Sequence, residues 1–95
     1  MKTCAQMMLS VVMDGIKDAE MIMDYAEAAK DNEEYYRWFK GKAKVRAEQT
    51  KADYDYVKTQ IKLEDKVKAG DDIAVALHSY LHEAVMGLME RINRI

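Results

Sequence analysis

An all-helical protein is expected from three features of these 95 residues. The chain has no proline and only four glycines, so little in it interrupts a helix. Its apolar residues recur at gaps of three and four, which is the helical period, and no run alternates as a strand does. Hydrophobic residues make up 49% of the chain, which argues against disorder. We therefore expect one helical domain over residues 1–95, folded as an antiparallel three-helix bundle with a long central helix.

The first expected helix spans about residues 3–30. Its apolar positions form a heptad seam made up of Ala5, Leu9, Val12, Ile16, Ala19, Met23 and Ala26. Met7, Met13 and Met21 lie beside this seam and widen the apolar face. Because methionine-rich faces suit adaptable protein contacts, we expect this helix to be covered on more than one side. A second copy of the chain is the favoured cover, and a different partner protein is the alternative.

A short polar stretch separates the first helix from the second. Asp31, with Glu34 three residues later, has the form of a capping box, so a new helix should begin near residue 33. Its expected range is 33–68, because Gly70 is a typical C-terminal stop. A connection this short makes the two helices antiparallel neighbours.

The third expected helix spans about residues 73–94, with Asp71 or Asp72 as its N-terminal cap. At about 1.5 Å per residue, the central helix would be about 54 Å long and longer than either neighbour. Its residues 35–45 would then lack cover from the third helix. That segment begins with four aromatic side chains, Tyr35, Tyr36, Trp38 and Phe39.

Leaving four aromatic side chains in water is costly, since each can bury about 150–250 Å². Two arrangements would cover them. The central helix bends near Gly41 and folds its first turns onto the other helices, or a second chain covers them in a homodimer. We favour the homodimer, because a chain this short has a small core and gains much from sharing one.

The same end of the central helix is strongly basic. Five cations and no acid fall within residues 37–46, namely Arg37, Lys40, Lys42, Lys44 and Arg46. With Trp38 among them, this pattern suits nucleic acid, through phosphate neutralisation and base stacking. The overall net charge of −2 is unlike that of a dedicated nucleic-acid-binding protein, so we favour a solvated helix face. The expected contact surface comprises Tyr35, Trp38, Phe39, Arg37, Lys40 and Lys44.

Two sets of residues have the spacing of metal ligands. His78 and His82 share one helix face, as a metal-binding pair requires, but we interpret them as polar residues at a solvent edge. Glu20 and Glu48 lie where half of a ferritin-like bundle would place its carboxylates. In such a bundle the second helix reads Glu-x-x-His, whereas here Lys51 takes the place of the histidine. We therefore expect no metal centre, no cofactor and no enzymatic activity.

The remaining features limit location and function. A single cysteine, Cys4, excludes an intramolecular disulfide and fits a reducing, cytoplasmic compartment. No apolar run reaches about 18 residues, so we expect neither a membrane span nor a signal peptide. The expected function is protein–protein contact, as an adaptor or structural accessory protein with a bacterial or phage-like appearance that no motif supports. A nucleic-acid-binding regulator and a degenerate ferritin-like metal-binding bundle are the alternatives.

Overall fold

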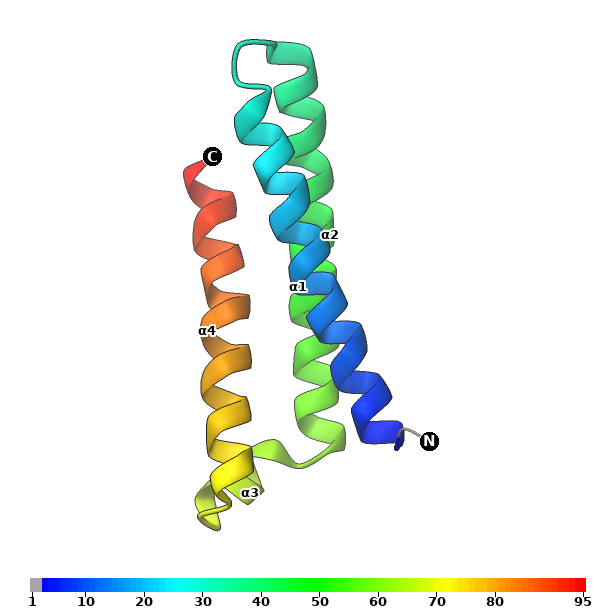
Figure 1. The fold of residues 1–95 in the computed structure, drawn as a ribbon, viewed down its shortest axis with the longest axis vertical. Coiled ribbons are helices and arrows are strands. Elements are labelled where there is room, and N and C mark those ends of the chain that lie inside the picture. Colours follow the sequence, from blue (N-terminus) through cyan, green and yellow to red (C-terminus); the bar gives the residue numbers. More distant parts are fainter. Residues whose placement is uncertain (1–2) are drawn as a thin grey trace.

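The computed structural model describes residues 3–95, which form helices joined by short turns and contain no strand. The helices are α1 (Cys4–Ala28), α2 (Glu33–Gln60), α3 (Leu63–Lys68) and α4 (Asp72–Arg94). Helices α1 and α2 form an antiparallel hairpin, α3 makes the turn at the opposite end, and α4 runs back beside both (Figure 1). The expected all-helical class is confirmed.

The N-terminal caps explain where α2 and α4 begin. The backbone N–H of Tyr35 donates to Asn32 Oδ1 at 3.2 Å, so Asn32 caps α2. The expected capping box of Asp31 and Glu34 is wrong by one residue. At α4, Asp71 Oδ1 accepts from the next turn of the helix at 3.0 Å, which makes it the cap.

The expected uninterrupted helix over residues 33–68 is wrong, because α2 ends at Gln60 and α3 begins at Leu63. Between them Lys62 adopts a left-handed conformation, with φ 54° and ψ 46°. In a straight helix Leu63 would point about 200° away from Ile61, and therefore away from the core. The turn at Lys62 reverses this, and Leu63 is only 2% exposed.

The core lies between α1, α2 and α4, and α1 and α2 come into close contact at Gly15. A side-chain carbon on Gly15 would lie 2.5 Å from Thr50 Oγ1, closer than two such atoms can pack. Thr50 is fully buried, and its hydroxyl donates to the backbone oxygen of Arg46 at 2.8 Å. The glycine therefore lets the two helices cross in contact. The buried apolar cluster around this crossing comprises Val12, Ile16, Ala19, Met23, Ala43, Ala47, Tyr54, Val57, Leu81, Val85, Leu88 and Ile92.

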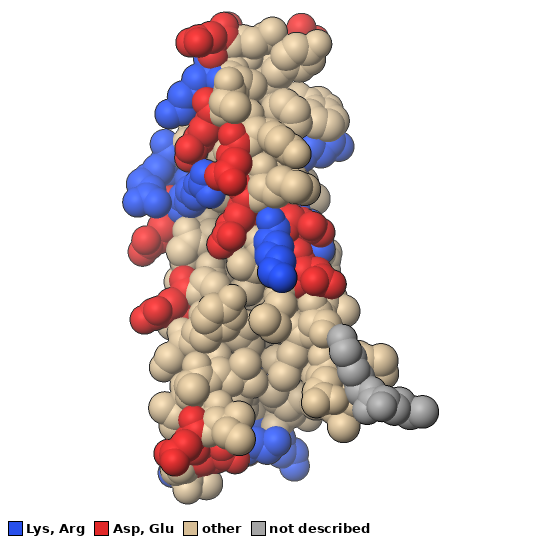
Figure 2. Space-filling view, in the orientation of Figure 1, with Lys and Arg blue, Asp and Glu red and all other residues tan. Residues whose placement is uncertain are grey.

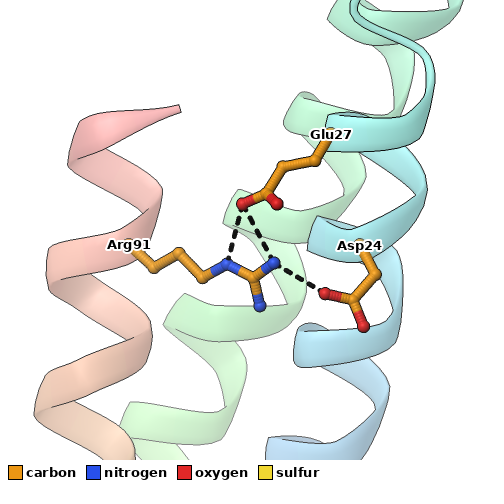
Figure 3. A network of polar contacts seen from close by, with 3 residues as sticks. All are labelled: Asp24, Glu27 and Arg91. Carbon is orange, nitrogen blue, oxygen red and sulfur yellow. Dashed lines mark hydrogen bonds and ion pairs between the residues drawn. The ribbon is translucent and has the colours of Figure 1, made fainter.

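An ion-pair network joins the C-terminal end of α4 to α1 (Figure 3). The Arg91 guanidinium donates to Asp24 Oδ1 at 2.6 Å and to Glu27 Oε1 at 3.0 and 3.2 Å. The hydrogen bond to Asp24, with a further one to Glu27, raises the pKa of Arg91 above its usual value. These contacts fix α4 against α1 at this level.

The hairpin between α1 and α2 extends beyond the C-terminal end of α4, so α4 does not reach the first turns of α2 (Figure 1). Helix α2 continues through Gly41 without interruption, and the chain does not turn there to cover its aromatic end. The molecule measures 49 × 27 × 16 Å and is thin for its length. Within residues 3–95, no helix is both long and apolar enough to cross a membrane.

Candidate protein interaction surface

The outer face of α2 carries large apolar side chains that no other helix of the described structure covers. Tyr35, Trp38, Val45 and Tyr56 are between 57% and 66% exposed. They belong to a set of eight positions with alternating gaps of three and four residues, all of them exposed. We call this set the outer seam: Tyr35, Trp38, Lys42, Val45, Gln49, Ala52, Tyr56 and Thr59. It lies on the side of α2 turned away from the core, so α2 has an apolar stripe on two faces.

The aromatic end of the outer seam is held in place by Phe39. The Phe39 ring is half-buried and lies 5.7 Å from the Tyr25 ring of α1. On its other side, Trp38 packs edge-on against Phe39 with the ring centroids 5.2 Å apart. Lys42 Nζ lies 5.3 Å from the centroid of the Trp38 ring, in the range of a cation–π contact. Phe39 thus links Trp38 to the fold, and Trp38 itself faces solvent.

Two cations of the basic run are engaged by acids within the chain. Arg37 pairs with Glu33 one turn earlier in α2, at 2.6 Å. Arg46 pairs with Asp18 of α1 at 3.2 Å, and this ion pair joins the two helices of the hairpin. Over the upper half of one face of the molecule, Figure 2 shows acidic and basic side chains intermixed.

Of the other three basic residues, two lie on the same side of α2 as Arg37 and one does not. Lys40 is half-buried with its Nζ 6.0 Å from the Tyr36 ring centroid. Lys44 is exposed and lies seven residues after Arg37, on the same side of the helix as that residue. Lys42 lies on another side, in the outer seam. Lys40 lies three residues after Arg37 and four before Lys44, so these three share one side of α2, whereas Lys42 and Arg46 lie on other sides.

Neither pair of potential metal ligands has a third partner in the described structure. The rings of His78 and His82 are stacked, with their centroids 5.6 Å apart and their planes within 7°. Glu20 and Glu48 are both exposed. Across residues 3–95, no three side chains of His, Cys, Asp or Glu gather closely enough to hold a metal ion. Cys4 is exposed near the start of α1.

A second apolar surface lies where α1 and α4 face outward together. Segments 3–13 and 73–82 contain no Asp, Glu, Lys or Arg, and Figure 2 shows a band without charge across the lower half of this face. Met7 and Val11 are each 52% exposed, and Tyr80 is 54% exposed. The methionines of α1 were expected to widen an apolar face here, whereas the contribution of α4 was not expected.

Comparisons with protein-family models, curated proteins and solved structures find no match to this chain. The outer seam of α2 is the surface that best combines exposed apolar side chains in the structure with residues expected to make contacts. Two of its members, Tyr35 and Trp38, were expected as contact residues. Val45 and Tyr56 were not, although the second heptad period in α2 is a signal that could have identified them.

Proposed function

We propose that this protein acts by protein–protein contact, as an adaptor or structural accessory protein, and that the outer seam of α2 is its contact surface. The observation that supports this is the row of four large, exposed apolar side chains from Tyr35 to Tyr56 on one helix face. Single exposed apolar residues are common on monomeric proteins and need no explanation. Four of them along one helix face, with only polar or small seam positions between, favour a surface that binds another protein.

The composition and rigidity of the outer seam also support binding. Tyrosine and tryptophan contribute most of the binding energy at many interfaces, and the outer seam has three of them. Helix α2 is a continuous helix of 28 residues whose opposite face is packed in the core. Binding on such a surface would cost little conformational entropy, because the backbone is already ordered.

A photoreactive residue in the outer seam tests this proposal. We suggest replacing Val45, at the centre of the seam, with benzoylphenylalanine and irradiating cells that make the protein at its natural level. A protein adduct is expected from this position. The matched control is the same replacement at Glu83, an exposed position of α4 on the side away from the core, from which no adduct is expected.

Two results would contradict the proposal. One is the absence of any adduct from position 45 under conditions in which the photoreactive group is consumed. The other is an adduct that nuclease digestion removes, which would favour the nucleic-acid-binding regulator instead.

A further inference from the structure

We infer that the partner of the outer seam is a second copy of this chain, bound with the two α2 helices antiparallel and with Trp38 of each copy against Tyr56 of the other. This inference rests on the proposed function and names the partner at the same surface. Three observations lead to it: the spacing of the outer seam, the charge on and beside it, and the accessible surface of the single chain.

The spacing of the outer seam is that of a two-stranded coiled coil. Its eight positions alternate gaps of three and four residues from Tyr35 to Thr59, and all but three of them are apolar or aromatic, the polar ones being Lys42, Gln49 and Thr59. The midpoint of the seam is at the level of Ala47. A two-fold axis at that level brings all eight positions of both copies into contact. The resulting layers are Tyr35 with Thr59, Trp38 with Tyr56, Lys42 with Ala52, and Val45 with Gln49.

Charge favours the antiparallel orientation over the parallel one. A parallel pair in register would place the two Lys42 ammonium groups directly opposite each other in the contact between the two helices. The antiparallel pair places Lys42 opposite the small side chain of Ala52 and beside Asp55 of the other copy. Helical side chains lean toward the N-terminus of their own helix, so in this orientation Lys42 and Asp55 lean toward each other. Both copies make this contact, which gives the interface two inter-chain ion pairs.

Asp55 is available for such a contact. In the single chain it pairs with Lys51 at 2.9 Å, and the two side chains are 49% and 41% exposed. An exposed pair one helical turn apart contributes little to stability, so Asp55 can be shared with a second cation at little cost. Within residues 3–95, Lys42 forms no ion pair with an acid, and its Nζ lies over the Trp38 ring.

The single chain exposes more surface than its size requires. Its accessible surface is 6508 Å², whereas a compact monomer of its 11.0 kDa mass exposes about 5,600 Å². The excess of about 900 Å² is close to the roughly 800 Å² that each partner buries in a standard interface. The three aromatic residues of the outer seam contribute to this excess. The surface that the single chain leaves in excess is therefore about as much as one stable partner would cover.

Paired charge reversals test both the partner and the register. In sedimentation equilibrium, the purified wild-type protein should approach twice the mass of one chain. Lys42→Asp and Asp55→Lys should each raise the dissociation constant by roughly tenfold, equivalent to about 1.4 kcal/mol. The double variant should recover most of the wild-type affinity. The two positions are 13 residues and about 20 Å apart within one helix, so the recovery can arise only between chains.

The matched control is Lys44→Asp, which makes the same charge change on α2 outside the outer seam and should leave the dissociation constant unchanged. Circular dichroism of each variant checks that the helices are intact. A wild-type protein that remains at the mass of one chain would overturn self-association; an adduct of another mass from position 45 would still support the proposed function. A dimer that neither reversal weakens would overturn the assigned face and register.

Discussion

At the crossing of α1 and α2, a single hydrogen atom on Gly15 takes the place of a side chain. The position is buried, and any added carbon would meet the Thr50 hydroxyl. Gly15→Ala should therefore lower the free energy of unfolding by about 1–3 kcal/mol, measured by urea denaturation, because the two helices must separate.

Gly87→Ala is the control for that substitution, since Gly87 lies in α4 with nothing within 4 Å of the added carbon. There the same change should raise stability by about 0.5–1 kcal/mol through helix propensity alone. Adding Thr50→Ala to Gly15→Ala should recover part of the loss. If alanine stabilised the protein equally at positions 15 and 87, the close contact at Gly15 would be wrong.

Tyr54 presents the opposite case, a buried side chain with a polar group left unused. It is 1% exposed, and its hydroxyl has no hydrogen-bond partner among residues 3–95. A buried donor without a partner costs about 1–3 kcal/mol, so Tyr54→Phe should leave stability unchanged or raise it by about 1 kcal/mol. A loss of stability greater than about 1 kcal/mol in Tyr54→Phe would show that the hydroxyl makes a stabilising contact.

The same residue makes stability depend on alkaline pH. Burial, together with the nearby Asp55 and Glu64 charges, raises the pKa of Tyr54 above its usual value of 10.0. Below the unfolded-state pKa of about 10, Tyr54 keeps its proton in both the folded and the unfolded state, so it adds no pH dependence to stability. Above it the unfolded chain releases the proton first, so stability falls as pH rises through the folded-state pKa. Urea denaturation of wild type and Tyr54→Phe across this range should show a steeper decline for wild type, and parallel profiles would contradict the assignment.

At the scale of the elements, the break between α2 and α3 depends on Lys62. A side chain in the left-handed region costs about 1–2 kcal/mol, and glycine adopts that region freely. Lys62→Gly should therefore raise the free energy of unfolding by about 0.5–1 kcal/mol. Lys66→Gly, within the helical residues of α3, should lower it by about the same amount. If both substitutions were destabilising, the chain would be helical through position 62.

Helical periodicity predicted the class and most of the helix ends, and it failed where one residue adopts an unusual conformation. The spacing of apolar residues located α1 and α4, because core burial imposes that spacing, and the polar stretch at residues 31–34 located the start of α2. The break at Lys62 was missed because lysine gives no local signal for a left-handed turn. The phase of Leu63 relative to Ile61 was the available clue, since both could not face the core in one helix. Asn32 and not the expected Asp31 caps α2, and the sequence could not distinguish them because either side chain can accept from a first-turn N–H.

The sequence predicted only the aromatic end of the candidate surface. Comparing helix lengths correctly placed the aromatic end of α2 beyond the cover of the last helix. Phe39 was expected within the contact surface, and it is half-buried against Tyr25, a contact that depends on how the two helices rotate about their axes. Of the outer seam, only the aromatic end was expected as a contact surface, because its aromatic side chains drew attention there. The same spacing continues to Val45 and Tyr56, and it was not followed that far.

At the scale of the whole molecule, the thin shape and the large accessible surface both favour a partner that covers apolar side chains. The chain is 49 Å long and only 16 Å thick, with a radius of gyration of 15.2 Å. A compact chain of this length has a radius of gyration of about 12.4 Å. Such a thin structure leaves a large part of its apolar surface exposed, on the outer seam and on the charge-free surface of α1 and α4. Pairing two copies along α2 would bury the outer seam and leave the charge-free surface exposed for a further contact.

The most direct test of this account is the fluorescence of Trp38, the only tryptophan in the chain, as a function of protein concentration. In the single chain its indole ring is 57% exposed, whereas in the antiparallel dimer it lies against Tyr56 of the other copy. Emission should therefore shift to shorter wavelength, and acrylamide quenching should weaken, as concentration rises from nanomolar to high micromolar. The Lys42→Asp variant should show the same transition at higher concentration. A Trp38 emission spectrum that stays constant over this range would contradict the dimer through the outer seam.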